Sequence, residues 1–197
     1  MTTGAMLQAS PGVQAGSKRC RGEDALQSVL AARREALGMN HAETLQAAMD
    51  VADHLMAHDK LAEAEVLLQK VVMARRATLG GDHAETITAV DVCAQCLLRQ
   101  HKYDDAEPML GIVTGIRRQQ LGMHHEDTWA AYRALAQCLM TQKKYATAEH
   151  VIRAMHDACD AKDDDDGDVK VTDELAQCLI LQEKFAAVSY THLRAHE

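Results

Sequence analysis

Residues 75–86 read RRATLGGDHAET, and the same arrangement of residue types occurs twice more in the chain. It occurs 42 residues earlier, at 33–44, as RREALGMNHAET, and 42 residues later, at 117–128, as RRQQLGMHHEDT. A fixed period of about 20–50 residues is typical of proteins built from copies of one small structural unit. The sequence therefore predicts a repeat array, and residues 75–86 mark the boundary between two of its units.

This stretch has the composition of a joint between two helices. Each copy contains a glycine directly after a helical apolar pattern, where a helix C-terminus favours a residue that tolerates positive φ. These glycines are Gly38, Gly80 and Gly122. An arginine pair precedes each glycine and is expected near the negative end of the helix dipole. The pattern predicts that one helix ends at the glycine.

The residues after the glycine predict the start of the next helix. Asp82 and Glu85 have the spacing of a capping box, in which two side chains satisfy the first backbone N–H groups of a helix. The corresponding pairs are Asn40 with Glu43 and, departing from the pattern, His124 with Asp127. We therefore predict N-caps at Asn40 and Asp82 and a weaker cap in the third copy.

Between the joints, apolar residues recur at helical spacing in two runs per unit, separated by a short polar break such as residues 58–60. We expect a helix over 23–37, followed by repeats at about 41–79, 83–121, 125–160 and 168–188. Residues 1–22 lack a helical period and are predicted to be disordered. Residues 189–197 drop the repeat pattern, so we expect an irregular or non-native tail on a fragment of a longer array.

The composition argues against several classes of function and of partner. Only 3% of the residues are aromatic and two are proline, which favours helices over sheets. The net charge of −8 argues against a nucleic-acid partner held by phosphate neutralisation. There is no run of 18 apolar residues, so no membrane partner is expected. The six cysteines occur without a secretory signal, which predicts reduced thiols in the cytoplasm.

The units also share residues within their helices. They are Leu135, Ala136, Leu139, Lys144, Tyr145, Ala148, Glu149 and Ile152 in the third unit, Ala94, Leu97, Lys102, Tyr103, Ala106, Glu107 and Leu110 in the second, and Ala52, Leu55, Lys60, Leu61, Ala64, Glu65 and Leu68 in the first. With the joint, this set resembles tetratricopeptide repeats in the 42-residue form of kinesin light chains and nephrocystin-type proteins. The resemblance implies an all-α, right-handed superhelical solenoid of antiparallel helical hairpins, with about 3.5 repeats.

Two features depart from the family pattern. The proline expected after the joint histidine is replaced by Ala42, Ala84 and Glu126. Pro108 falls inside the second helix of the second unit, where it removes a backbone hydrogen bond, so we expect a local kink.

The joint histidines His41, His83 and His125 stand one repeat apart. Packed helices are about 8–10 Å apart, whereas zinc–nitrogen bonds are about 2.0–2.1 Å long, so these histidines cannot share one zinc ion. We predict that they pack or cap the joint.

Other cysteine and histidine patterns also favour packing over metal or redox chemistry. Cys96, Cys138 and Cys178 occupy one repeat position, which His54 takes in the first unit, and Cys93 completes a C-x2-C pair with Cys96. A small, semi-buried packing site explains this pattern. Asp50, His54 and His58 are spaced i, i+4, i+8, which allows a metal site but is also typical of a solvated or groove-lining helix face.

Residues 163–168 are rich in aspartate, as calcium loops are. Lys162 occupies the position of the first obligatory ligand, so a solvated acidic loop is the better interpretation. No phosphate-binding loop or nucleophile motif is recognisable, and we predict a protein that is not an enzyme and has no cofactor.

The resemblance implies where a partner binds. In the family, the first helices of successive repeats line a concave groove that receives extended peptides or helices. Transferring this register places at the groove Gln46, Met49, Asp53 and Met56 from the first unit, Thr88, Asp91, Gln95 and Arg99 from the second, Ala130, Arg133, Gln137 and Met140 from the third, and Lys170, Asp173 and Gln177 from the fourth. Amides can hydrogen-bond a peptide backbone, and cations can bind a carboxylate. An ordinary solvated surface is the alternative.

The leading prediction is a non-catalytic scaffold that binds a protein or peptide partner, such as a cargo adaptor. The first alternative is the sensor array of a larger signalling NTPase, and the second is a metal- or redox-responsive helical protein. End-to-end self-association through uncapped terminal repeats is a further partner prediction.

Overall fold

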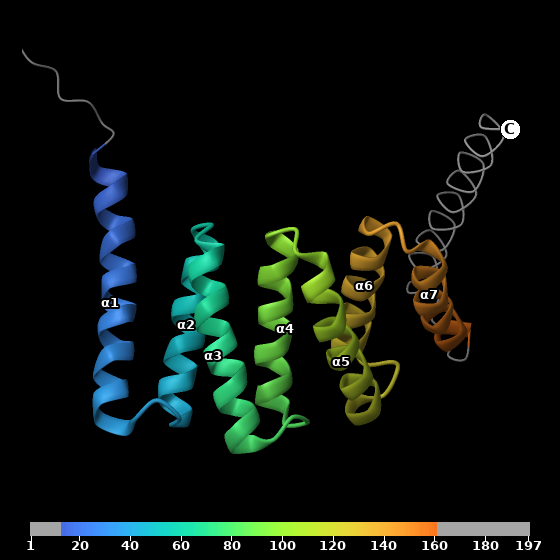
Figure 1. Cartoon of the computed structure of the whole chain (residues 1–197), viewed down its shortest axis with the longest axis horizontal. Coiled ribbons are helices and arrows are strands. Elements are labelled where there is room, and N and C mark those ends of the chain that lie inside the picture. The colour runs from blue at the N-terminus through green and yellow to red at the C-terminus, as the bar shows by residue number, and fades with distance from the viewer. Residues whose placement is uncertain (1–12, 161–197) are drawn as a thin grey trace, which may run out of the picture. The chain divides into compact units, whose positions relative to one another are not determined.

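The computed structural model describes residues 13–160 of the 197, and side chains over 22–155. This part contains α1 (Val13–Leu37), α2 (Ala42–Ala57), α3 (Leu61–Leu79), α4 (Ala84–Arg99), α5 (Tyr103–Leu121), α6 (Glu126–Thr141) and α7 (Tyr145–Asp160), joined by short loops (Figure 1). No strand occurs among the described residues. The all-α prediction is confirmed, and none of the described helices is long and apolar enough to span a membrane.

The helix boundaries agree with the predicted hairpins except at the N-terminus. α1 begins at Val13, whereas residues up to 22 were predicted to be disordered. Extending an existing helix adds one hydrogen bond for each residue fixed, so a segment without an apolar stripe can continue a helix that has already formed. The predictions for residues 1–12, for the fourth repeat at 168–188, for the acidic stretch 163–168 and for the tail at 189–197 lie outside the described residues.

The chain divides into two compact units, residues 1–74 and residues 75–197, and the boundary falls within α3. In the first unit, Leu45, Ala52 and Leu55 of α2 are buried, as are Ala64 and Leu68 of α3. Successive members of each set are three, four or seven residues apart, which places them on one side of the helix. This is the apolar pattern from which the two helices were predicted.

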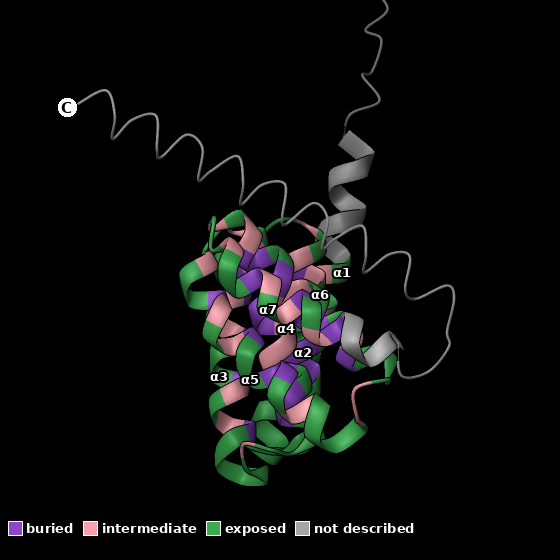
Figure 2. Cartoon of the chain, turned by 90° about the vertical axis from the view of Figure 1, so that its right-hand side faces the viewer, coloured by how far each residue is buried: buried purple, intermediate pink, exposed green. Residues whose placement is uncertain are grey.

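In the second unit, α5 packs against both α4 and α6, and α6 packs against α7. Ala94 and Leu97 of α4, Leu110 of α5 and Cys138 of α6 form one buried cluster. A second cluster joins α6 to α7 and includes Leu139 and Ile152. Buried residues gather on the facing sides of the helices, and exposed residues cover the outer turns (Figure 2). The shared clusters fix α4, α5 and α6 beside one another.

α5 runs without interruption through Pro108. Pro108 lies in the second turn, beyond the positions where a helix N-terminus tolerates proline, so it cannot donate to the carbonyl of Asp104. The helix therefore continues with one backbone hydrogen bond fewer. The exposed position of Pro108 allows water to reach this turn.

The two helices of each hairpin are joined by a turn that contains a residue with positive φ but no glycine. These residues are Asp59, His101 and Lys143, with φ of 62°, 60° and 62°. In the first hairpin, Lys60 N–H donates to Leu55 O at 2.9 Å and Asp59 N–H to Met56 O at 3.1 Å, the pair of bonds that defines a Schellman motif. The same pair of bonds recurs in the two later turns. The local bonds thus hold a strained backbone conformation.

Candidate functional site

The repeated stretch forms the joint that the sequence predicts. Gly38, Gly80 and Gly122 follow the last residues of α1, α3 and α5 and have φ of 89°, 94° and 84°. Residues other than glycine rarely adopt such angles. The prediction that these glycines end the helices through positive φ is confirmed.

The capping prediction for the next helix is wrong by one residue. The N-caps of α2, α4 and α6 are His41, His83 and His125. In α4, the Nδ1 atom of His83 accepts a hydrogen bond from the backbone N–H of Glu85 at 3.3 Å, and the corresponding distances in α2 and α6 are 3.3 and 3.2 Å. An Nδ1 acceptor requires the neutral ring with its proton on Nε2. The capping role of the joint histidines is thereby confirmed.

The proposed capping boxes at Asn40 and Asp82 do not form because the helix starts after the histidine. Glu43 and Glu85 then stand at the second helical position, whereas a capping box requires the third. The third cap was predicted to be weaker, but its hydrogen bond at His125 is as short as the others. Each acidic residue still lies in the first turn, where the helix dipole favours negative charge.

The first arginine of each pair fastens the end of one helix to the start of the next. In the second unit, Arg75 is buried, and its Nη1 atom donates to the backbone carbonyl of Glu85 at 2.8 Å. Arg33 and Arg117 donate to the carbonyls of Glu43 and Asp127 at 3.1 and 3.2 Å. Residues of the repeated stretch therefore stabilise the joint between one helix and the next.

Lysines directly before α7 and α3 form ion pairs with glutamates of α5 and α1. Lys144 Nζ lies 2.6 Å from Glu107 Oε2, and in the first unit Lys60 Nζ lies 2.6 Å from Glu23 Oε1. The hydrogen bond from the lysine lowers the pKa of Glu107 and of Glu23, and burial partly opposes the effect. These repeated charges are also structural.

The histidines of α2 do not form a three-ligand metal site. His54 Nε2 and His58 Nε2 lie 3.2 Å apart, while Asp50 accepts a hydrogen bond from Gln46 at 3.1 Å. Among the described residues, no group of three histidine, cysteine or acidic side chains is arranged to hold a metal ion. At the positions of His54 and His58, the later units have a cysteine and a glutamine. In the third unit these are Cys138 and Gln142, and Gln142 Nε2 donates to Cys138 Sγ at 3.4 Å.

The described cysteines have the surroundings of packing residues. Cys93, Cys96 and Cys138 are free thiols and are buried. Burial raises the pKa of Cys138, although a hydrogen bond from Gln142 opposes the effect. A raised pKa leaves less thiolate, which is the reactive form. The geometry supports the packing interpretation of this repeat position.

The groove positions of the second unit lie on two neighbouring helices. Thr88, Gln95 and Arg99 of α4 are exposed, as are Ala130, Arg133 and Gln137 of α6; Met140 is half-buried. The buried sides of these helices contribute Ala94, Leu97 and Cys138 to one core cluster. Gln95 and Gln137 therefore occupy equivalent exposed positions on helices that pack through a shared core.

Asp91, which was predicted to line the groove, forms an ion pair within the structure. Its Oδ2 atom lies 2.8 Å from Nη2 of Arg117, and each side chain keeps only 15% of its surface exposed. Arg117 thus binds Asp91 and the carbonyl of Asp127 at once. Binding a partner through Asp91 would require this pair to open.

In the first unit, Gln46 and Asp53 are exposed and Met56 is half-buried. Met49 is only 5% exposed, so its assignment to the solvent side is wrong. It lies four residues after Leu45 and three before Ala52, which places it on the buried side of α2.

Asp50 is the exposed residue that the register transfer missed in the first unit. With Asp53 it makes this face acidic, and burial, followed by the charge of Asp50, raises the pKa of Asp53. The i, i+4 and i+7 spacing of Gln46, Asp50 and Asp53 was the signal available in the sequence. Lys170, Asp173 and Gln177 lie outside the described residues.

Helical hairpins linked by recurring joints define a helical-repeat protein. The model of the family described as "Tetratricopeptide repeat" matches residues 43–119. The chain is similar to the crystal structure of a putative kinesin light chain of Podosopora anserina with nearly identical TPR-like repeats, at 19% identity, a TM-score of 0.79, and coverage of 92% of this chain and 88% of that one.

A variant of that Podosopora anserina protein aligns with 20% identity and a TM-score of 0.78, covering 92% of this chain and 88% of that chain. A double mutant of MamA aligns with 16% identity and a TM-score of 0.51, covering 86% of this chain and 93% of that chain. No curated protein matches the sequence. The predicted resemblance and the TPR-like solenoid fold are confirmed, and they support a protein-interaction scaffold.

Proposed function

We propose that this chain is a non-catalytic adaptor that binds an extended or helical segment of a partner protein along the exposed face of α4 and α6. The observation that carries the proposal is the equivalent placement of Gln95 on α4 and Gln137 on α6. The two amides are exposed at equivalent positions on helices joined by one core cluster. A repeat geometry of this kind presents the same chemical group at regular intervals along a surface.

The chemistry of this face suits a peptide backbone. Each glutamine amide has both donor and acceptor atoms, so it can bind the N–H and the C=O of an extended segment. Arg133 stands one turn before Gln137, within reach of a carboxylate on the same segment. The half-buried Met140 adds an adaptable apolar contact.

The test begins with display selection of peptides on the wild-type protein, followed by fluorescence anisotropy with the selected peptide. We expect Gln137→Ala to weaken binding several-fold and Arg133→Glu to weaken it at least about tenfold, since hydrogen bonds to charged groups contribute roughly 1.5–3 kcal/mol. The matched control is Arg118→Glu, which makes the same charge change at an exposed position of α5. If Arg118→Glu weakens peptide binding as much as Arg133→Glu does, the peptide responds to the net charge of the protein, and the assignment of the site to α4 and α6 is refuted.

A further inference from the structure

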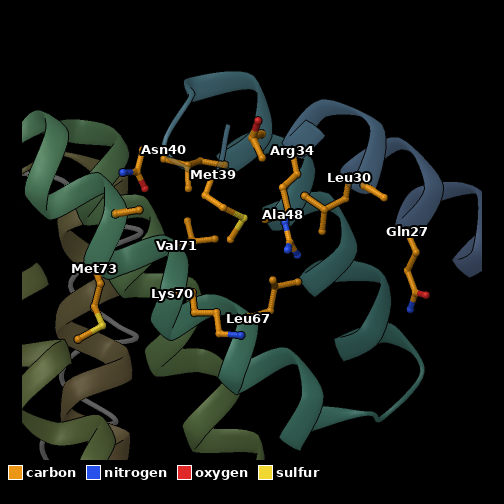
Figure 3. Close-up of a pocket in the computed structure, with 14 residues that line it drawn as sticks. Gln27, Leu30, Arg34, Met39, Asn40, Ala48, Leu67, Lys70, Val71 and Met73 are labelled. Atoms are coloured by element: carbon orange, nitrogen blue, oxygen red, sulfur yellow. The ribbon is translucent and has the colours of Figure 1, made fainter. Parts of the chain in front are cut away.

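The first unit contains a cavity of about 600 Å³ between α1, α2 and α3. Leu30 of α1, Leu45 of α2 and Leu67 of α3 contribute apolar walls, and Ala48 and Val71 lie between them. Figure 3 shows side chains from three separate helices and from the loop before α2 around one space. Its volume falls in the range of about 300–1,000 Å³ that is typical of small-molecule sites.

Two cationic side chains also line this cavity. They are Arg34 of α1 and Lys70 of α3, both labelled in Figure 3. Within the described part of the chain, neither side chain makes an ion pair, and no acidic residue is among those that line the cavity. The whole chain carries a net charge of −8, so this local positive charge is opposite in sign to that of the protein.

The corresponding positions in the second unit have different properties. Met39 beside the cavity is 48% exposed, whereas Met123, two repeats later, packs against a core cluster. Lys70 is replaced by Ile112 one repeat later and by Ala154 two repeats later. The second cation and the exposed methionine beside this cavity are therefore features of the first unit that the repeat pattern does not require.

We propose that this cavity binds a small amphiphile with a single carboxylate and an apolar chain. The guanidinium of Arg34 offers two parallel donors to a carboxylate, and the ammonium of Lys70 adds a second positive charge. The apolar walls shield the chain of the ligand from water. The two cations beside apolar walls complement the carboxylate and the apolar chain of such a molecule.

Isothermal titration calorimetry of the full chain with decanoate, below its aggregation concentration, tests the proposal. We expect saturable binding of one decanoate per chain, and about fourfold weaker binding for each methylene removed, as in nonanoate and octanoate. Decylamine has the same tail and the opposite charge, and we expect it to bind at least tenfold more weakly. Absence of decanoate binding, or equal binding of decylamine, would overturn the proposal.

Variants locate the site. Arg34→Glu and Lys70→Glu should each weaken decanoate binding at least tenfold, whereas Arg76→Glu, at the position of Arg34 one repeat later, should leave it unchanged. Ala31→Trp fills the space from an exposed position of α1 and should abolish binding while circular dichroism shows a folded protein. If Arg76→Glu weakens binding as much as Arg34→Glu, the ligand responds to net charge and the site assignment fails.

A second copy of this chain is the competing occupant of the cavity. Sedimentation equilibrium without decanoate distinguishes it, because a dimer that Ala31→Trp converts to a monomer would make the cavity a self-association surface and overturn the proposal. A wild-type monomer that binds decanoate supports it. This site is independent of α4 and α6, so loss of decanoate binding leaves the proposed peptide-binding function standing.

Discussion

Replacing Gly122 by alanine isolates the energetic contribution of the backbone conformation at a joint. Gly122 has φ of 84° and ψ of 171°, a region that is essentially restricted to glycine and costs other residues about 1–3 kcal/mol. A Cβ atom at this position would meet no atom within 4 Å, so the substitution adds strain without a clash. The lower entropy of unfolded alanine offsets about 0.4–1 kcal/mol. We expect Gly122→Ala to lower the free energy of unfolding by about 1–2 kcal/mol.

Gly111→Ala is the matched control. Gly111 lies inside α5, and a Cβ atom there would also meet nothing within 4 Å. Because alanine favours a helix interior by about 0.5–1 kcal/mol over glycine, this variant should be more stable than the wild type. Urea unfolding followed by circular dichroism at 222 nm measures both. If the two substitutions shift stability in the same direction, positive φ is not what Gly122 contributes to the joint.

Three further substitutions test the contacts that the repeats share. Arg75→Ala should lower the free energy of unfolding by about 1–3 kcal/mol in urea, because it removes the hydrogen bond from the buried Arg75 guanidinium to the carbonyl of Glu85, while Arg76→Ala should change it by less than about 0.5 kcal/mol. His83→Ala should lower it by about 0.5–2 kcal/mol through loss of the N-cap, and His83→Asn should restore most of the loss; equal losses in both would refute the cap. Lys144 lowers the folded-state pKa of Glu107 from 4.5, so the pair stabilises the fold above the unfolded-state pKa of that carboxyl and loses this contribution as pH falls through the lowered value. Thermal unfolding at pH 7 and pH 3 should therefore show a smaller loss of Tm for Glu107→Gln than for the wild type, and equal losses would contradict the ion pair.

Apart from the first turns of α1, the sequence was sufficient to predict the described helices because three independent signals agree at each joint. The apolar spacing sets the helix face, the glycine tolerates positive φ, and the second arginine of each pair lies in the last turn. It was not sufficient to place the N-cap, because Asn40 and His41 are both residues that can accept a backbone hydrogen bond. Only the backbone coordinates show that the histidine carries the extended φ and ψ of a cap, at −72° and 141°.

The backbone conformation of the hairpin turns was also not predictable from the sequence. Asp59 and His101 are of types that adopt positive φ more often than other non-glycine residues, whereas Lys143 has no such preference, and positive φ costs residues other than glycine roughly 1–2 kcal/mol. The two Schellman hydrogen bonds of each turn and the packing of the helices on either side impose it. Such a conformation is decided by the hydrogen bonds of the turn and by the packing of its two helices, which single-residue preferences do not record.

The candidate groove shows why repeat register alone cannot assign a binding surface. Met49, Asp91 and Arg133 occupy the same repeat position, so the register gives all three the same place on the first helix of their units. In the structure Met49 is buried, Asp91 is bound to Arg117, and Arg133 is exposed. Register fixes the position of Cα, whereas polarity and the neighbours of each copy decide whether the side chain enters the core, forms an ion pair or faces water. The residues of the joints are shared by all copies and are occupied by structural contacts, whereas specificity for a partner should depend on positions that differ, such as Arg133.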